Sequence, residues 1–353
     1  MTTVLFTCVG MRVDIVTAFK RAGATTIAAD ASPLAPALYS ADAYALVPLK
    51  DDAAYIPALR DVCAAHAVDL VVPVTDIDQQ VVSERRAELG APVLLPEHEV
   101  VLKTSDKYLA HSTFDALGIA SPPTWLPGEL PAALPFPVLV KARYGFGSKH
   151  IYRAHDLHEL EFFLTHTPAD SMVQACCVGE EFSIDVFCDW EGRCLNAIPR
   201  TMIESKGGES IKGMTIDDAA LIELGRRVAE ALPLRGPGTI QCFREADGSL
   251  RVTDVNPRFG GAFPLPQAAG ARYPELALQL AAGVHPEPRV GEFRAGVVMT
   301  RFLSDVCLTY DADGTLEPLA PEASDGGATN SAEVGFARRS YNAGRASDDL
   351  RRG

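Results

Sequence analysis

Short apolar runs alternate with amphipathic stretches over the first hundred residues of the chain. The runs have the length and β-branched content of buried strands, and the stretches between them repeat apolar residues at helical spacing. Strands and helices in alternation build a parallel sheet with helices on its faces. We therefore expect residues 1–102 to form one α/β domain with the order VLFTC, helix 12–22, TTIAAD, YALVPL, helix 53–67, DLVVPV, helix 78–89 and APVLL.

The carboxyl ends of these strands carry few signals of a dinucleotide site. The turn after the first strand, CVGMR, contains one glycine, Gly10, so the GxGxxG pattern is missing. Asp30 at the end of the second strand does not indicate NAD binding without those glycines. Asp76 and Asp78 follow the strand DLVVPV, and we expect at least one of them to cap the next helix.

A loop that suits phosphate groups follows the strand PVLVKAR. Lys141 lies near the end of this strand, and Gly145, Gly147 and Ser148 come directly after it. Glycines let successive backbone N–H groups converge on phosphate oxygens, and the lysine adds a positive charge. A Gly-x-Gly loop is also common in ordinary hairpins, so the loop alone leaves both interpretations open.

Elsewhere in the central part of the chain, the pattern predicts further helices and strands. The stretch 103–118 reads as a helix with Ser105 as its N-cap and Gly118 at its end. Helices are also expected over 156–165, 217–232 and PELALQLAAG, with one or two closing strands in VVMTRFLSDVCL.

The segment MVQACCVGEEF has features of a purine pocket. Residues 174–177 could present backbone groups and a flat apolar surface to a purine ring, and Glu181 could accept hydrogen bonds from ribose hydroxyls. A plain edge of an antiparallel sheet explains these residues equally well. Further on, Arg200 suggests that an anion is held, and the polar loop 201–215 is either a lid or a long surface connection.

A predicted hairpin over residues 239–255 gathers oxygen ligands on one face. Its strands flank Asp247-Gly248, a strong hairpin turn signal. Pairing positions that sum to 495 places Gln241 opposite Asp254, and period-2 alternation adds Asn256 to the same face. Clustered carboxylate and amide oxygens suit Mg²⁺. An ordinary surface hairpin with its polar residues in water is the alternative.

Composition bounds the class of protein and its partners. The chain has 353 residues, of which 47% are hydrophobic and 22% charged, as in soluble globular proteins of two or three domains. A net charge of −14 argues against a nucleic-acid-coating surface or an anionic membrane as partner. No run of 18 apolar residues and no basic leader occurs, and the eight cysteines show no CxxC pair. We therefore expect a cytoplasmic protein with reduced thiols.

The candidate residues occur in the order Lys107, Lys141, the glycine loop, the segment 174–181 and DVNPR. With this order the chain resembles the ATP-grasp superfamily, most closely its single-module proteins that are similar to the carbamoyl phosphate synthase large subunit. The resemblance covers about residues 1–305. It implies an α/β and α+β fold with a Rossmann-like pre-ATP-grasp domain (1–102), an ATP-grasp N-terminal subdomain (103–175) and an ATP-grasp C-terminal subdomain (176–305). Residues 306–353 would form a closing strand and a flexible tail.

The resemblance also implies roles for single residues. Lys107 and Lys141 would hold the α and β phosphates of ATP, and Gly145, Gly147 and Ser148 would close over them. Gln174, Ala175 and Cys177 would line the adenine pocket, and Glu181 would bind ribose. One or two Mg²⁺ ions, or Mn²⁺ in their place, would be held by Gln241, Asp254 and Asn256. Arg258 and Arg200 would be the catalytic cations. Family members usually carry Glu at the position of Asp254.

The function that follows is an ATP- and Mg-dependent carboxylate–amine ligase that acts through an acyl phosphate. Its partners would be a small carboxylic acid and an amine, with no nucleic acid and no membrane, and the protein would be a homodimer. Because the chain has one ATP-grasp module rather than two, we expect a product other than carbamoyl phosphate. An enzyme that phosphorylates carbamate or bicarbonate, and a nucleotide-binding protein without catalysis, are the alternatives.

Overall fold

The computed structural model describes residues 1–145, 150–167, 170–206, 209–311, 314–319 and 340–341. Contacts divide the chain into two compact units, Met1–Val93 with Phe302–Gly353, and Leu94–Arg301. The predicted tail lies outside the described residues, apart from a two-residue strand, Ser340–Tyr341.

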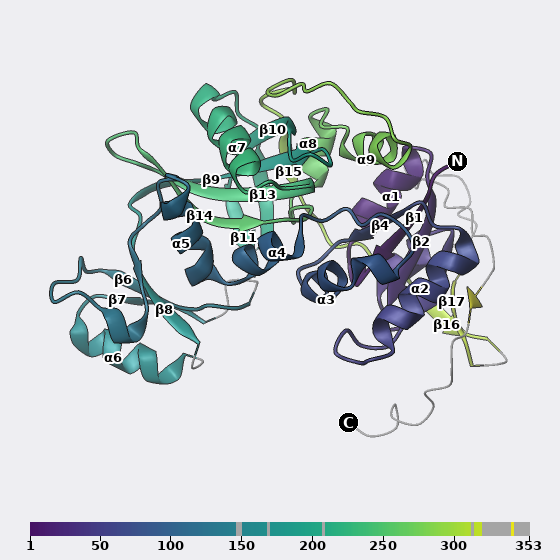
Figure 1. Ribbon diagram of the computed structural model, residues 1–353, viewed down its shortest axis with the longest axis horizontal. Helices are drawn as coiled ribbons and strands as arrows, with labels where there is room; N and C mark the ends of the chain where they lie inside the picture. The colour runs from purple at the N-terminus through teal and green to yellow at the C-terminus, as the bar shows by residue number, and fades with distance from the viewer. Residues whose placement is uncertain (146–149, 168–169, 207–208, 312–313, 320–339, 342–353) are drawn as a thin grey trace. The chain divides into compact units, whose positions relative to one another are not determined.

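The first unit is built on a parallel sheet (Figure 1). Its strands are β1 (Thr3–Thr7), β2 (Thr25–Asp30), β3 (Ala43–Leu46), β4 (Leu70–Pro73) and β18 (Ser340–Tyr341), with a separate pair β16 (Leu308–Tyr310) and β17 (Leu316–Pro318). Its helices are α1 (Val13–Arg21), α2 (Tyr55–His66) and α3 (Gln79–Glu84), with 3₁₀ turns at Pro36–Ser40 and Arg86–Glu88.

The centre of this sheet is buried on both faces. β1 pairs in parallel with β2 on one side and with β4 on the other, and Val4, Leu5 and Phe6 of β1 are fully buried. A continuous apolar strand of this kind is typical of a parallel sheet covered on both faces. Phe6 meets Phe19 of α1 edge to face, with ring centroids 5.1 Å apart. The parallel sheet and the helices predicted for this region are therefore confirmed.

Two details of the first unit differ from the prediction. The run APVLL forms only a single parallel bridge, between Val93 and Val71. Asp78 precedes α3 without capping it. Its carboxylate instead accepts hydrogen bonds from Thr7 Oγ1 at 2.6 Å and Tyr55 OH at 2.7 Å, and it is fully buried. Asp78 therefore does not provide the cap that we expected from at least one of Asp76 and Asp78.

The second unit contains two four-stranded antiparallel sheets and one smaller sheet. The first has the order β5 (Thr124–Trp125), β8 (Ser171–Ala175), β6 (Val138–Ala142), β7 (Ile151–Ala154). The second has the order β10 (Cys194–Thr201), β9 (Gly179–Cys188), β13 (Gly236–Glu245), β14 (Leu250–Asn256). The small sheet has the order β11 (Glu204–Lys206), β12 (Glu209–Met214), β15 (Val298–Thr300). The helices are α4 (His98–Ser105), α5 (Lys107–Ala116), α6 (Leu157–His166), α7 (Ala219–Ala231), α8 (Pro264–Ala268) and α9 (Tyr273–Ala281), with a 3₁₀ turn at Pro127–Glu129.

One face of each large sheet is covered by a helix, which leaves the other face for a site. Leu160 of α6 packs against Val138, Val140 and Val173, and Figure 1 shows α6 below β6, β7 and β8. α7 covers the second sheet through a larger apolar cluster. Gly225 lets α7 approach closely, since a Cβ there would lie 2.6 Å from Ile184 Cγ2. The polar residues that alternate with these apolar ones face the opposite way.

Two predictions for the second unit are wrong. The helix predicted over 103–118 is two helices, with Ser105 the last residue of α4; Asp106 caps α5 by accepting hydrogen bonds from the backbone N–H groups of Tyr108 and Leu109. The predicted loop 201–215 contains the strands β11 and β12, and β12 pairs with β15.

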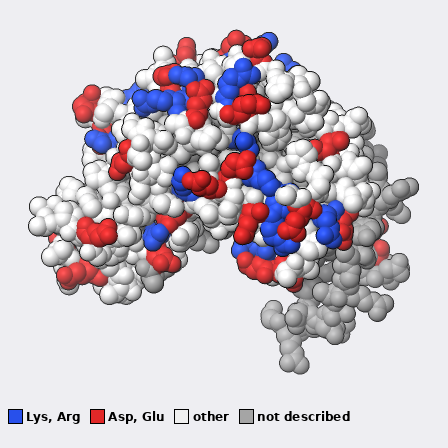
Figure 2. Space-filling model, viewed as in Figure 1, with Lys and Arg blue, Asp and Glu red and all other residues white. Residues whose placement is uncertain are grey.

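Basic and acidic side chains are interspersed on the face shown in Figure 2. On α7, for example, Arg226 forms ion pairs at 2.6 Å with both Glu223 and Glu230. Among the described residues, no helix combines the length and the apolar character that crossing a membrane requires.

Candidate active site

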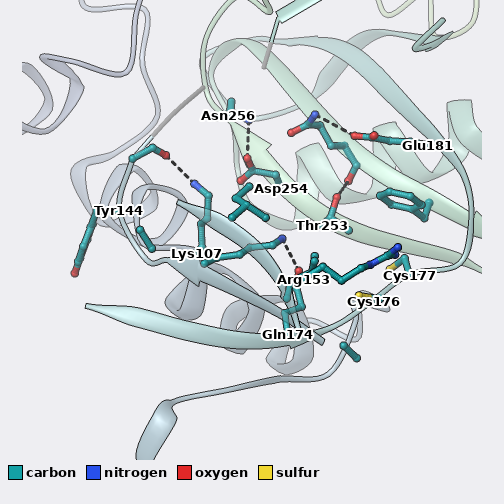
Figure 3. A pocket seen from close by; sticks show the side chains of 18 of the residues that line it. Lys107, Tyr144, Arg153, Gln174, Cys176, Cys177, Glu181, Thr253, Asp254 and Asn256 are labelled. Atoms are coloured by element: carbon teal, nitrogen blue, oxygen red, sulfur yellow. Dashed lines mark hydrogen bonds between the residues drawn. The ribbon is translucent and has the colours of Figure 1, made fainter. Parts of the chain in front are cut away.

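A cavity of about 380 Å³ lies in the second unit, within the size range of small-molecule sites. One wall comes from α5, β6, β7 and β8, and the other from β9, β13 and β14 (Figure 3). Eleven of the predicted site residues line it: Lys107, Lys141, Gly145, Gln174, Ala175, Cys177, Glu181, Gln241, Asp254, Asn256 and Arg258. Gly147 and Ser148 lie outside the described residues, and Arg200 is not among the lining residues.

The register of the second sheet explains how its polar residues meet. Arg200 of β10 pairs with Ser183 of β9, Ser183 with Gln241 of β13, and Gln241 with Asp254 of β14. Residues directly opposite in antiparallel strands point to the same face. The pairing of Gln241 with Asp254 is the one that the hairpin pattern predicts, and Asn256, two residues on, also lines the cavity.

The same hairpin contains a β-bulge that the pattern does not predict. Beyond Gln241 the pairing shifts by one residue, so that Cys242 pairs with Val252 and Arg244 with Leu250. The predicted register is therefore wrong toward the turn. The extra residue is Thr253, which lines the cavity beside Asp254 and donates a hydrogen bond from Oγ1 to the Gln241 carbonyl at 3.3 Å. Bulges often re-aim side chains at sites of this kind.

The oxygen ligands on this wall fit a hard divalent cation. Asp254 supplies a carboxylate, and Asn256 Nδ2 lies 3.3 Å from Asp254 Oδ2. Gln241 Nε2 lies 3.5 Å from Glu181 Oε1. No group of three or more His, Cys, Asp or Glu side chains suited to a metal occurs in the described part of the chain. One carboxylate with two amide oxygens suits a Mg²⁺ ion whose other ligands are water and phosphate oxygens.

Two lysines supply positive charge from the facing wall. Lys107 Nζ donates to the Gly145 carbonyl at 2.9 Å, and Lys141 Nζ donates to Gln174 Oε1 at 2.6 Å. Burial lowers the pKa of Lys141, although the nearby Asp254 carboxylate favours its charged form. Since a buried ammonium gains from an added anion, this arrangement suits the phosphates of a nucleotide.

Asp106 ties the start of α5 to the end of β6. Besides capping the helix, its carboxylate forms an ion pair with Arg143 and accepts a hydrogen bond from Tyr144 OH at 2.9 Å. Partial burial opposes ionisation of Asp106, but the hydrogen bonds from Arg143 and Tyr144 lower its pKa. Lys107 follows Asp106 directly, so the same contacts fix the lysine beside the glycine loop.

We expect Asp106→Ala to destabilise the protein by about 1–3 kcal/mol, because it removes a helix cap and leaves Arg143 without this carboxylate. Urea unfolding followed by circular dichroism measures the change. The variant Asp218→Ala at the cap of α7, which also loses a partner for Arg244, is the matched comparison. A loss of less than about 0.5 kcal/mol in Asp106→Ala would contradict the structural role.

Arg200 shares the face of the sheet that bears Gln241 and Asp254, but it is buried there and does not line the cavity. Its side chain is 3% exposed, and its Nε donates to Asp185 Oδ2 at 2.7 Å. Thr239 Oγ1 donates to the other oxygen of Asp185 at 3.0 Å. The ion pair engages Nε of Arg200, whereas its buried Nη1 has no hydrogen-bond partner among the described residues. Arg200 is not among the residues that line the cavity, so its catalytic role stays a prediction.

Several lining residues were missed in the sequence. Phe243 alternates with Gln241 on β13 and could have been found from strand period. Arg153 lies on β7 opposite Leu139, so strand period could also have indicated it. Tyr144 and Thr253 carry no such signal, because a turn and a bulge set their directions. The sequence analysis also does not single out His111, whose Nε2 lies 2.7 Å from Gln174 Nε2.

His111 predicts a pH dependence of stability. Burial, and then the charge of Lys141, lower its pKa from 6.5 to about 4. Between these values the unfolded chain binds more protons than the folded protein, so stability is lost as pH falls through this window. The loss that His111 causes between pH 7 and pH 5 is about 2 kcal/mol. The urea midpoint of the wild type should fall more between pH 7 and pH 5 than that of His111→Asn. Equal decreases in the two midpoints would contradict this role of His111.

Two family models match the chain. One, described as the PylC-like N-terminal domain, matches residues 4–94. The other, described as ATP-grasp in the biosynthetic pathway with Ter operon, matches residues 167–302. Among curated proteins, the carbamoyl phosphate synthase large chain of Clostridium botulinum (strain Alaska E43 / Type E3) is 27% identical over 214 residues, or 53% of this chain and 20% of that protein. The matched region thus spans a fifth of that relative.

Solved structures share the fold. The biotin carboxylase domain of Hydrogenobacter thermophilus 2-oxoglutarate carboxylase, in complex with MgADP, ADP and bicarbonate, has a TM-score of 0.69 at 16% identity, over 84% of this chain and 73% of that chain. The L-amino acid ligase of Bacillus licheniformis has a TM-score of 0.67 at 19% identity, over 84% and 78%. Together with the family models, these shared folds confirm the resemblance found in the sequence: residues 167–302 match an ATP-grasp model, and the chain is similar to ATP-grasp ligases.

Proposed function

We propose that this protein is a carboxylate–amine ligase that uses ATP and Mg²⁺ and forms an acyl-phosphate intermediate. The observation that carries the proposal is one cavity with two ammonium groups on one wall and the oxygen ligands of Asp254 and its neighbours on the other. A cationic wall that faces a metal-binding wall suits a nucleoside triphosphate, whose phosphates would lie between the two.

The reaction needs activation because a carboxylate has no good leaving group. A carboxylate oxygen attacks the γ phosphorus of ATP, the bond from that phosphorus to the bridging oxygen breaks, and ADP leaves. The amine nitrogen then attacks the acyl carbon, the bond from that carbon to the phosphate oxygen breaks, and phosphate leaves as the amine loses a proton. Amide, ADP and phosphate are the products.

The residues of the cavity meet the electrostatic demand of the first step. Two anions must approach each other, so Lys107 and Lys141 would hold phosphate oxygens and Arg258 would face the transferred group. Mg²⁺ held by Asp254, Asn256 and Gln241 would offset the remaining phosphate charge. The glycine loop after β6 would exclude water from the acyl phosphate.

The relatives favour this chemistry and one alternative. The name of the Bacillus licheniformis neighbour, L-amino acid ligase, describes joining of amino acids. The carbamoyl phosphate synthase relative and the bicarbonate in the Hydrogenobacter complex favour phosphorylation of bicarbonate or carbamate as the second candidate. A small acid and a small amine are the partners we propose. A cytoplasmic location and a homodimer remain predictions.

The proposal is tested by measuring ADP release with a panel of carboxylic acids, each with and without amines. For an active acid labelled with ¹⁸O in its carboxylate, an acyl phosphate requires one ¹⁸O atom to appear in the released phosphate. Mass spectrometry of the product distinguishes an amide from a product formed from bicarbonate. Nucleotide binding without ADP formation for any acid, or phosphate free of the label, would contradict the proposal.

A further inference from the structure

The turn that follows β14 brings Arg258 to the cavity. The Arg258 guanidinium lies against this turn, because its Nη1 donates to the Phe259 carbonyl at 3.3 Å and its Nη2 donates to Asn256 Oδ1 at 3.4 Å. Arg258 and Asn256 both line the cavity, and Figure 3 shows Asn256 joined to Asp254 by a hydrogen bond. A shift of the turn would therefore move the guanidinium relative to the predicted metal ligands.

Gly260 packs this turn closely against a buried ion pair of the sheet. A Cβ on Gly260 would lie 2.6 Å from Thr239 Oγ1 and 2.7 Å from Asp185 Oδ1. Both of these atoms are fixed, because Thr239 Oγ1 donates to Asp185 Oδ1 at 3.0 Å and Arg200 Nε donates to the other carboxylate oxygen. Glycine allows this close approach of the backbone, and a methyl group here would push the turn away from the sheet.

An arginine beside the small sheet holds the same turn from a second element. Arg301 Nη1 donates to the Gly261 carbonyl at 2.8 Å. Arg301 follows β15 directly, and its backbone N–H donates to the Ile211 carbonyl of β12 at 3.0 Å. A buried apolar cluster that includes Ala262 and Met299 joins the end of the turn to β15. The small sheet thus anchors the turn through one side chain and through packing.

We propose that Gly260 and Arg301 are positioning residues that keep Arg258 directed at the phosphoryl group transferred from ATP. This inference rests on the proposed function, which places Arg258 at that group. Neither Gly260 nor Arg301 lines the cavity, so both act through the turn rather than on the nucleotide. A hydrogen bond from a guanidinium is roughly twice as strong as one between neutral groups, so its loss would leave the turn free to shift.

The test measures equilibrium binding of MgADP and of Mg²⁺ with AMP-PNP, an ATP analogue that is not hydrolysed. The ratio of the two dissociation constants isolates the contribution of the γ phosphate. The wild type should bind AMP-PNP about tenfold more tightly than ADP, the factor expected of one charge-assisted hydrogen bond. In Arg301→Met this preference should fall to about twofold, while the affinity for MgADP stays within about twofold of the wild type.

Coupling to Arg258 separates positioning from a general structural role. Arg258→Met should itself lower the preference for AMP-PNP, and adding Arg301→Met should cause no further loss, because its effect passes through the same guanidinium. Equal losses from Arg301→Met in the two backgrounds would refute the positioning role. Arg193→Met is the matched control, since Arg193 Nη2 donates to the Pro286 carbonyl at 3.0 Å and does not line the cavity. This control should keep the wild-type preference.

Gly260→Ala keeps the proposal testable should Arg301→Met fail to fold, because it displaces the same turn from its other attachment. The preference for AMP-PNP should again fall to about twofold. Gly225→Ala is its control: a Cβ there would lie 2.6 Å from Ile184 Cγ2, outside the cavity lining, and the preference should persist. An unchanged preference in Arg301→Met or Gly260→Ala would overturn the proposal, as would a wild type that binds both nucleotides equally. A wild type that binds neither nucleotide would instead refute the proposed function.

Discussion

Replacing Asp254 with asparagine is expected to lower ATP-dependent ADP formation by about 10²–10³-fold without unfolding the protein. Asp254 is the carboxylate in the predicted oxygen set of Gln241, Asp254 and Asn256, and an amide of the same shape is a much poorer Mg²⁺ ligand. Because Asn is isosteric with Asp, the pairing of β13 with β14 should persist. Turnover measured over a range of Mg²⁺ concentrations should also show a higher Mg²⁺ requirement.

Asp247→Asn is the matched control, since it makes the same change in the same hairpin. Asp247 Oδ1 accepts a hydrogen bond from the Ser249 backbone N–H at 2.9 Å in the turn, and Asp247 does not line the cavity. Asparagine keeps that acceptor, so activity should be unchanged. Equal activity of Asp254→Asn and Asp247→Asn at limiting Mg²⁺ would remove Asp254 from the metal site.

Asp185→Asn is expected to destabilise the protein by about 3–5 kcal/mol, the usual cost of removing one partner of a buried ion pair. Asp185 is 2% exposed, and its carboxylate accepts from both Arg200 and Thr239. The packing is tight, because a Cβ on Gly260 would lie 2.7 Å from Asp185 Oδ1. The variant leaves the Arg200 guanidinium charged and buried. Urea unfolding at constant pH measures the loss.

Glu223→Gln provides the comparison for this effect. It breaks an ion pair of similar N–O distance on the exposed side of α7, where Arg226 keeps Glu230 as a second partner. Exposed pairs contribute about 0–1 kcal/mol, so little stability should be lost. A cost for Asp185→Asn no larger than that for Glu223→Gln would show that Arg200 is not held by this ion pair.

The sequence predicted the parts of the site that depend on local spacing. Gln241 and Asp254 could be placed on one face because strand period and the Asp247-Gly248 turn set the pairing. The bulge at Thr253 was not predicted, because regular alternation was assumed along β14, whereas its buried residues Val252 and Val255 lie three positions apart. Ser105 and Asp106 are adjacent and both are of types that favour helix N-caps, so the sequence alone did not show that Asp106, which also pairs with Arg143, is the cap of α5.

Features that join remote elements could not be predicted. The contact of His111 with Gln174 spans 63 residues, and that of Arg200 with Asp185 needs the register of β10 on β9. The strands β11 and β12 lie in a polar, glycine-rich stretch, and pairing of β12 with β15 overrides that local preference. Long-range pairing thus accounts for most of what the sequence left open.

The most direct test of the nucleotide site is a crystal structure with Mg²⁺ and a non-hydrolysable ATP analogue. We predict that the base lies beside Gln174, the phosphates contact Lys107 and Lys141, and a metal ion lies on Asp254. An analogue that binds in solution but is found outside this cavity, or a metal ion remote from Asp254, would contradict the proposal.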